Sequence, residues 1–271
     1  MGSVLRLVGF VTLISLGVLP AQKSDAANKL LDWTFNDATF VDANGGDTGA
    51  REAARAVYTP PGGISEANPS PGSGGKNILG SIDSLSNPQR SQPTLGKAGQ
   101  WGLTQFYVSL YMYIHPDIPN GELESIKLFE VSDSSDSIDG QTLNWLIVQL
   151  YPGNFNLYSN GAASGKYFGK WSGFLQGGWH KYEVFVKYNT PGQSDGIVKV
   201  WIDNVLVGQV TNVNYWSSTV KVNTFSAVYH FKTFGSAVGA IQGTVQIDDI
   251  QLWDDIPPNA APSPPSNVRL R

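Results

Sequence analysis

The sequence of 271 residues has no cysteine and only three histidines. Without cysteine there are no disulfide bonds and no cysteine-based catalysis, so the core must stabilise the fold by itself. Charged residues are also scarce, at 15% of the chain, and the net charge is -4 at pH 7. No basic stripe is available to neutralise phosphates, which excludes nucleic acid as an expected partner.

Long apolar runs are missing beyond the first residues. Arg6 supplies a positive charge, an apolar run extends over residues 7–19, and Ser24-Asp25-Ala26 provides small residues for cleavage. This order is typical of a secretory signal peptide, which we place at residues 1–26. The sequence therefore predicts a secreted protein, extracellular or periplasmic, with no membrane attachment once the signal is removed.

Several catalytic signatures are missing as well. The sequence lacks those of serine hydrolases, P-loop proteins and dinucleotide-binding proteins. Retaining glycoside hydrolases need two carboxylates close together on a groove-facing strand. Asp248 and Asp249 come closest, but adjacent residues of a regular strand point to opposite faces. Glycoside hydrolysis is therefore disfavoured.

What the sequence does contain is a series of short strand patterns. Glycine is abundant, with 30 residues, and aromatic residues make up 11% of the chain. Asp203-Asn204 is a candidate hairpin turn. No convincing helix is found apart from a short candidate at 49–57. The pattern predicts an all-β protein with two antiparallel sheets packed as a sandwich, its main strands at 30–37, 105–115, 144–151, 180–189, 196–203, 225–234 and 243–253.

The domain organisation follows from the composition. We expect one domain over residues 27–256, and a monomer. Residues 41–100 are rich in Gly, Pro, Ser and Asn and predict mostly loop with short strands, which in a compact domain is often functional. Residues 257–271 are proline-rich and predict an extended linker or tail.

The strand over 105–115 alternates between two kinds of residue. One face carries Phe106, Val108, Leu110, Met112 and Ile114, and the other carries Tyr107, Ser109, Tyr111, Tyr113 and His115. The same split is predicted for two later strands. In the strand over 144–151, the outward residues are Trp145, Ile147, Gln149 and Tyr151. In the strand over 225–234, the outward residues are Ser226, Val228, His230 and Lys232, and the core residues are Phe225, Ala227, Tyr229 and Phe231.

If these three strands share a sheet, their outward series form one surface. Aromatic rings stack on pyranose rings, and amide, phenol and imidazole groups bond sugar hydroxyls. The surface therefore predicts a polysaccharide partner, with an anionic one included because a few local cations can serve a groove. The alternative is that the tyrosines only cover an outer sheet face, where β propensity favours aromatic residues. Sugar contacts are expected from Tyr107, Tyr113, His115, Trp145 and Lys232.

Four segments together resemble a known superfamily: FYVSLYMYIHPDIP, IKLFEV, GGWHKYEVFVKYNTPGQSDGIVKVWIDNVLV and GTVQIDDIQLW. They are similar to concanavalin A-like jelly rolls of the lectin/glucanase superfamily, with secreted polysaccharide-lyase-like proteins as the closest likeness. The resemblance covers residues 30–253 and is most specific at 179–190 and 195–203. It implies two antiparallel sheets, of which one is concave and forms the glycan groove.

The resemblance also implies a chemistry. Lyases of this fold cleave uronate-containing glycans by β-elimination, which needs a group that neutralises the carboxylate, a base and an acid. Carried onto this sequence, Gln149 is the neutralising group, His230 or His115 the base, and Tyr111 or Tyr151 the acid. Arg90 and Lys232 are candidates for binding uronate carboxylates.

The sequence lacks the signatures of alginate-lyase-like proteins. It has no R-x-E-x-R, no Q-[IV]-H and no Y-x-K-x-G-x-Y-x-Q, and its second site reads VQLY, without a histidine. A noncatalytic carbohydrate-binding or lectin-like module, or a surface adhesion domain, therefore stays open as the alternative.

The lyase chemistry requires no cofactor, but a structural metal ion is conceivable. In many such jelly rolls a calcium ion ties the last strand to the first. Asp249, Asp37 and Asp32 could contribute to such a site, because calcium prefers several hard oxygen ligands. The alternative is that these aspartates are simply solvated at strand ends.

Overall fold

The computed structural model describes residues 26–36, 63–65, 68–75, 77–83, 95–116, 118, 123–133, 144–159, 166–169, 174–233 and 242–260. Within these ranges all regular secondary structure is β-strand, and no helix there could cross a membrane. The helix candidate at 49–57 lies outside the described residues, as does nearly all of the predicted signal peptide.

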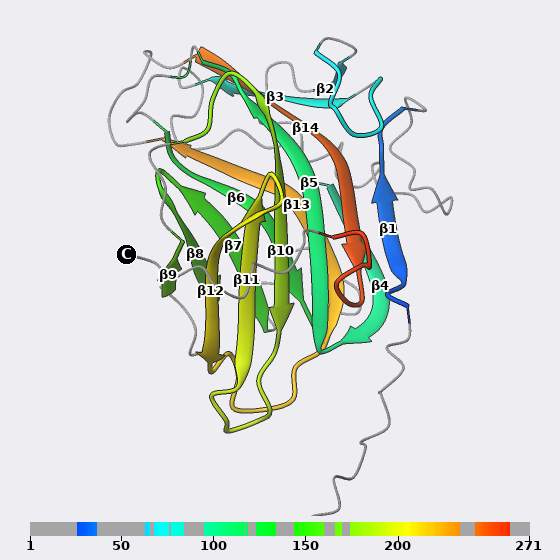
Figure 1. Cartoon of the computed structure of the whole chain (residues 1–271), viewed down its shortest axis with the longest axis vertical. Helices are drawn as coiled ribbons and strands as arrows, with labels where there is room; N and C mark the ends of the chain where they lie inside the picture. Colours follow the sequence, from blue (N-terminus) through cyan, green and yellow to red (C-terminus); the bar gives the residue numbers. More distant parts are fainter. Residues whose placement is uncertain are drawn as a thin grey trace, which may run out of the picture.

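The chain forms strands β1 to β14, which Figure 1 labels. Their bounds are β1 (Lys29–Trp33), β2 (Gly63–Ser65), β3 (Asn77–Asp83), β4 (Leu95–Leu103), β5 (Gln105–Ile114), β6 (Leu123–Ser132), β7 (Trp145–Tyr151), β8 (Asn154–Ser159), β9 (Lys166–Phe168), β10 (Trp179–Lys187), β11 (Gly196–Ile202), β12 (Val205–Val213), β13 (Val222–Thr233) and β14 (Gln242–Trp253).

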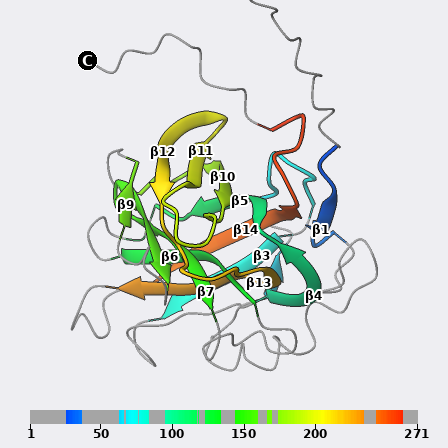
Figure 2. The same ribbon diagram turned by 90° about the horizontal axis from the view of Figure 1, so that it is seen from below.

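These strands build two antiparallel sheets that stack as layers (Figures 1 and 2). The eight-stranded sheet has the order β12-β11-β10-β5-β14-β3-β2, and β1 pairs with β14 as well. The six-stranded sheet has the order β4-β13-β6-β7-β8-β9. The predicted all-β sandwich of two antiparallel sheets is confirmed.

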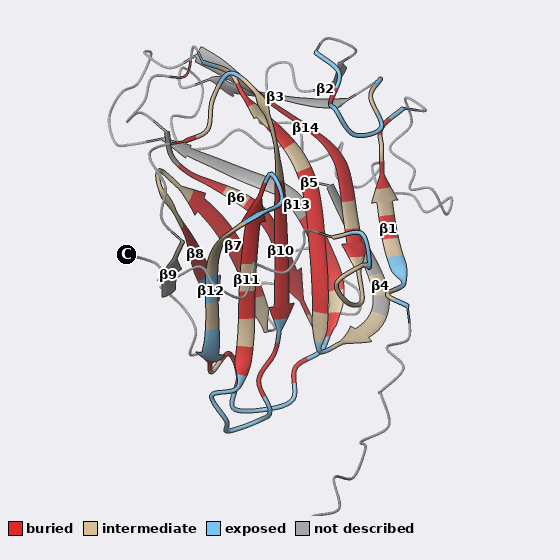
Figure 3. Cartoon of the chain, viewed as in Figure 1, coloured by how far each residue is buried: buried red, intermediate tan, exposed pale blue. Residues whose placement is uncertain are grey.

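The core lies between the sheets and is built from alternate residues of each strand. The apolar series predicted for β5, from Phe106 to Ile114, is entirely buried (Figure 3). It meets the inner residues of β6 and β7, as in the edge-on contact of Phe106 with Phe129 at 6.0 Å between ring centroids. Each fully buried side chain of this kind contributes about 1.5–3 kcal/mol to stability. Alternation in the sequence therefore identified the core face correctly.

The hairpin between β11 and β12 turns where the sequence predicts it. Asp203 and Asn204 have φ angles of 51° and 66°, the left-handed conformation that tight two-residue hairpin loops require. Asn and Asp tolerate this conformation better than most residues because their short polar side chains can bond the nearby backbone.

A second, smaller apolar cluster lies on the outer face of the eight-stranded sheet. Its buried members are Tyr107, Phe185 and Trp201, and Trp253, Ile256 and Ala260 pack against them. The chain therefore packs against this face of the sheet as far as Ala260.

Candidate functional site

The three strands expected to share one surface lie in different sheets. β5 belongs to the eight-stranded sheet, whereas β7 and β13 belong to the six-stranded sheet. Because the inner residues of β5 and β7 meet in one core, their outer faces lie on opposite sides of the sandwich. The expected common surface is therefore wrong, and neither Tyr111 nor His115 can act together with Gln149.

The outer face of the six-stranded sheet has a row of polar residues across neighbouring strands. Lys127 of β6 is the direct partner of Gln149 of β7, and Gln149 is the direct partner of Asn156 of β8. On the other side of Lys127, the backbone of His230 in β13 is its direct partner. Direct partners in an antiparallel ladder have Cα atoms about 4.5–5.5 Å apart. We call Lys127, Gln149 and Asn156 the polar row.

A β-bulge in β6 places Lys127 in this row. The pairing register shifts between Lys127 and Phe129, which leaves Leu128 as the extra residue. Ile126 and Phe129 are both fully buried although they are three residues apart, a spacing that a regular strand would send to opposite faces. The bulge resets the alternation, so Lys127 and Glu130 both lie on the outer face.

Lys127 is one of the site residues that sequence reasoning missed. In the sequence, the segment IKLFEV indicates the fold and does not mark Lys127 as a site residue. Two adjacent apolar residues, Leu128 and Phe129, interrupt its alternation and were the available signal of a bulge. Bulges are enriched next to functional sites, where they redirect a side chain. A similar register shift lies between Ala227 and His230, so the regular alternation predicted for 225–232 does not hold through β13.

Gln149 and Tyr151 form a hydrogen-bonded pair on this face. The hydroxyl of Tyr151 lies 3.3 Å from Oε1 of Gln149 and donates a hydrogen bond to it. Gln149 is 8% exposed, and Tyr151 is half-buried. Because the amide oxygen accepts from Tyr151, the amide nitrogen is the end of Gln149 that can donate to a ligand. The sequence placed both residues on one face correctly.

Glu130 lies one row further along β6. Its direct partners are Ser226 and Ile147, and its side chain is only 5% exposed. Burial raises the pKa of Glu130 to about 7, against the opposing effect of the positive charge of Lys127. The face therefore holds a carboxyl group that exchanges a proton near neutral pH.

An aromatic pair flanks the polar row. The rings of Trp145 and Tyr158 lie 5.2 Å apart between centroids, at an angle of 47°. Tyr158 is the direct partner of Ile147 in β7, and its side chain is 45% exposed. Trp145 was a predicted sugar contact, and Tyr158 was missed because its strand was not assigned an outward face.

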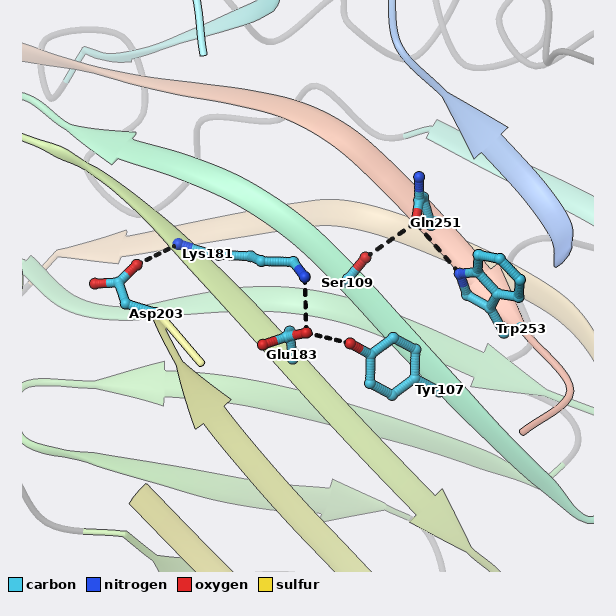
Figure 4. A network of polar contacts seen from close by, with 7 residues as sticks. All are labelled: Tyr107, Ser109, Lys181, Glu183, Asp203, Gln251 and Trp253. Carbon is cyan, nitrogen blue, oxygen red and sulfur yellow. Dashed lines mark hydrogen bonds and ion pairs between the residues drawn. The ribbon is translucent and has the colours of Figure 1, made fainter. Parts of the chain in front are cut away.

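Tyr107 is enclosed on the opposite face of the molecule. It is 1% exposed, and its hydroxyl donates to Oε1 of the fully buried Glu183, which also accepts from Nζ of Lys181 at 2.8 Å (Figure 4). Burial, followed by the hydrogen bond to Glu183 and by the negative charge of Glu183, raises the pKa of Tyr107 well above its usual value. The expected sugar contact by Tyr107 does not fit this packing, because the C-terminal segment covers the ring.

The other polar residues of β5 stay on that opposite face. The ring of Tyr113 lies 5.9 Å from that of Trp179 and 6.1 Å from that of His115. Tyr111 packs against the loop at 68–75, where Gly72 approaches it closely. Burial and the charge of Asp249 raise the pKa of Tyr111. These residues form a separate aromatic surface, remote from the polar row.

Asp248 and Asp249 do not follow regular alternation. The register of β14 shifts between Asp248 and Gln251, and Asp249 has a φ of 51°. Asp248 pairs with the outward-facing Tyr111, and Asp249 lies with Tyr111 against Gly72, so the two carboxyl groups share one side. Both are nonetheless buried, and burial raises the pKa of Asp248 to about 7. This enclosed pair is not open to a glycan.

The predicted calcium ligands have protein partners where they are described. Oδ2 of Asp249 accepts from the backbone N–H of Ser73 at 2.7 Å and from Oγ of Ser70 at 3.1 Å. Asp32 pairs with Lys29 and accepts from Gln251. Asp37 lies outside the described residues, among which no group of three or more acidic or histidine side chains could hold a metal ion. The calcium site stays a prediction.

Two of the predicted site residues, Arg90 and Lys232, are cations. Arg90 lies outside the described residues. Lys232 is placed by its backbone pairing with Ser125 of β6, which puts it in the six-stranded sheet with the polar row.

No family model matches the sequence, and no curated protein matches it either. The fold, in contrast, is similar to that of solved structures. An endo-β-1,4-glucuronan lyase from the fungus Trichoderma reesei matches with a TM-score of 0.52 and 12% identity, over 75% of this chain and 93% of that one. Alginate lyase Aly36B matches with a TM-score of 0.51 and 14% identity, over 82% and 95% of the two chains.

A third match is the marine PL-14 alginate lyase from Aplysia kurodai. Its TM-score is 0.50 at 13% identity, over 70% of this chain and 86% of that one. At such identities the likeness concerns the fold alone. The protein thus has the concanavalin A-like jelly-roll fold that polysaccharide lyases use, as the resemblance in the sequence predicted.

Proposed function

We propose that the protein is a secreted polysaccharide lyase that cleaves a uronic-acid-containing glycan by β-elimination on the outer face of its six-stranded sheet. The observation that carries the proposal is the hydrogen bond from Tyr151 to Gln149, placed beside Lys127 in one row. The fold likeness to a glucuronan lyase and to alginate lyases supports the same class of substrate. Secretion rests on the N-terminal sequence.

The first requirement of β-elimination is to make the proton beside the uronate carboxylate acidic. Loss of that proton leaves negative charge shared with the carboxylate, and donors held in place lower its free energy. The amide nitrogen of Gln149 donates to the carboxylate in this scheme, because Tyr151 occupies the amide oxygen. Lys127, the direct partner of Gln149, supplies a positive charge on the same side.

The second requirement is a base and an acid. The C–H bond beside the carboxylate breaks, its electron pair forms the new C=C bond, and the C–O bond to the neighbouring sugar breaks. His230, next to Lys127 by backbone register, takes the proton. As the C–O bond breaks, the hydroxyl of Tyr151 releases its hydrogen bond to Gln149 and gives its proton to the departing oxygen. His115 and Tyr111, the other two predicted choices, are ruled out of this site because they belong to the other sheet.

A polymer panel tests the proposal. The protein is incubated with alginate, glucuronan, pectate and heparin-type glycans, and absorbance of the unsaturated uronate product is followed. We expect turnover on at least one polymer and its loss in Gln149→Ala. The matched control is Gln251→Ala, which removes an outward glutamine from the eight-stranded sheet and should leave turnover unchanged. If no polymer yields product and the protein is nevertheless retained on a glycan affinity gel, the proposed lyase activity is overturned.

Retention on the gel without any product would support a noncatalytic glycan-binding module on the same face. The observation in its favour is the aromatic pair of Trp145 and the exposed Tyr158, which suits stacking on sugar rings. In such a module, Trp145→Ala abolishes retention on the gel, whereas Tyr151→Phe, which removes only a hydroxyl, leaves it nearly intact.

A further inference from the structure

Two side-chain oxygens on β8 are buried without a hydrogen-bond donor. They are Oδ1 of Asn154 and Oδ1 of Asn156, and neither accepts a hydrogen bond. Asn156 as a whole is only 4% exposed. Buried polar atoms in folded proteins nearly always have a partner, because an unsatisfied one loses the hydrogen bonds that water would supply. Two such atoms on one short strand therefore require an explanation.

The two asparagines lie directly beside the proposed catalytic pair. Asn156 is the ladder partner of Gln149, and Asn154 is the ladder partner of Tyr151. Residues two apart on a strand share a face and are separated by about 6–7 Å along it. The two asparagines on β8 therefore lie beside Gln149 and Tyr151 on β7, each directly opposite one of them.

Folding alone does not favour asparagine at these positions. Asparagine is depleted in β-strands, where β-branched and aromatic residues pack better on a pleated surface. β8 has six residues, and two of them are asparagines on the same face. Residues that weaken the local structure without gaining a protein partner are expected where a ligand provides the missing contact.

The chemistry of the missing partner is restricted. An amide oxygen only accepts hydrogen bonds, so its partner must donate. An ionised uronate carboxylate has no proton to donate, whereas the hydroxyl groups of the same sugar chain do. A hydroxyl converted to an ester loses its donor and leaves the buried oxygen unsatisfied, which a site built for donors rejects strongly.

We propose that Asn154 and Asn156 form a subsite that accepts hydrogen bonds from free ring hydroxyls of the glycan, next to the sugar whose carboxylate Gln149 and Lys127 hold. The inference rests on the proposed function and deepens it. It assigns to β8 the selection of uronic-acid polymers with unsubstituted hydroxyls over their O-acetylated forms. The competing explanation is a pair of buried waters that satisfy the two oxygens and have no part in recognition.

The test measures binding and not turnover, so that it stands apart from catalysis. Oligosaccharides of glucuronan and of alginate, each unsubstituted and O-acetylated, are titrated calorimetrically into Tyr151→Phe, which keeps the substrate intact. In this background, Asn156→Val and Asn154→Val are each expected to weaken binding of the unsubstituted oligosaccharide at least tenfold. They are also expected to reduce the preference over the acetylated form. Asn212→Val, an exposed asparagine on β12, is the matched control and should change neither.

Thermal unfolding of the same variants separates recognition from structure. Because valine suits a strand and removes an unsatisfied oxygen, the melting temperature of each β8 variant should equal or exceed that of its parent. Unchanged binding and preference in both variants would overturn the subsite and indicate buried water. A lower melting temperature in both would overturn it as well, since the amides would then stabilise the fold. If the parent itself binds no oligosaccharide, the proposed function fails and the subsite fails with it.

Discussion

Lys127 and Gln149 are direct partners across the β6–β7 ladder, and the bulge at Leu128 turns Lys127 to the outer face that Gln149 occupies. In a regular strand, residues two apart share a face, so the burial of Phe129 would direct Lys127 into the core. The arrangement places a cation and an amide side by side on one surface. A uronate carboxylate can receive a charge and a hydrogen bond there at the same time.

Removing the charge of Lys127 should impair the proposed lyase reaction. Lys127→Met retains most of the length of the side chain and loses the ammonium group. We expect kcat/KM to fall about 10²–10³-fold, the range found when one group stabilising the developing charge is removed. The unsaturated product provides the measurement. Lys199→Met on β11 in the other sheet is the control, and an equal loss in both variants would contradict a specific role.

Removing the hydroxyl of Tyr151 should affect the rate more than binding. Tyr151→Phe retains the ring and loses both the proposed acid and the bond that orients Gln149. We expect kcat to fall about 10²–10⁴-fold, as for loss of an acid or base, with a much smaller change in KM. Tyr113→Phe removes a phenol from the opposite face and should leave kcat unchanged. A kcat for Tyr151→Phe within twofold of the parent would remove Tyr151 from the mechanism.

The buried carboxyl of Glu130 should make stability depend on pH. Its folded-state pKa of about 7 lies above the ordinary 4.5, so the folded protein holds this proton more tightly than the unfolded chain. The contribution is complete below about pH 4.5 and is lost as pH rises through about 7. Two and a half pKa units correspond to about 3 kcal/mol. Glu130→Gln has no such proton to lose.

Urea unfolding of parent and Glu130→Gln between pH 4 and 8 measures this effect. The difference in unfolding free energy between the two proteins should move by about 3 kcal/mol in favour of the variant as pH rises. Asp248→Asn, at the other buried carboxyl with a pKa of about 7, should show a shift of the same sign. A difference that stays constant over this range would show that Glu130 titrates normally.

Tyr107 should matter for stability and not for glycan turnover. Tyr107→Phe removes the hydroxyl that donates to the buried Glu183 and leaves Lys181 as the remaining described donor to that carboxylate. A hydrogen bond to a charged group contributes about 1.5–3 kcal/mol, so the unfolding free energy should fall by that amount. Turnover at 25 °C should stay unchanged because Tyr107 lies across the sandwich from the polar row. A selective loss of turnover with normal stability would contradict this assignment.

Gly72 should tolerate no side chain. A Cβ at this position would lie 1.8 Å from Oδ2 of Asp249 and 2.9 Å from Cε2 of Tyr111. Gly72→Ala should therefore displace the loop that donates to Asp249 and lower the unfolding free energy by about 1–3 kcal/mol. Gly178→Ala is the control, because its Cβ would meet only Nε2 of His180 at an ordinary 3.6 Å. Equal stability of Gly72→Ala and the parent would contradict close packing of this loop.

Much of the fold could be predicted from local sequence patterns. The alternation from Phe106 to Ile114 identified a core face, and the Asp203-Asn204 pair identified a hairpin turn. These features depend on neighbours along the chain, where side-chain direction and turn conformation follow from the residue types themselves. For the same reason, Gln149 and Tyr151 were assigned correctly to one face of one strand.

The candidate site was only partly predictable. Gln149 was identified, but Lys127 and Tyr158 were missed, and Tyr107 was assigned to a surface from which the C-terminal segment excludes it. These errors arise because local alternation along one strand does not reveal tertiary features. A bulge changes the face of every residue beyond it, and local alternation cannot show whether a distant segment covers a strand.

The sequence by itself determined the β-class of the protein, its core faces and the residue types available for chemistry, because these follow from composition and from the two-residue period of a strand. Only the tertiary structure decided which of those residues meet. In the folded protein, β5 lies in one sheet and β7 in the other, and Lys127, Gln149 and Asn156 are aligned across three strands. The physical reason is that strand pairing joins segments far apart in the chain, and the burial of the whole sandwich selects among the possible pairings.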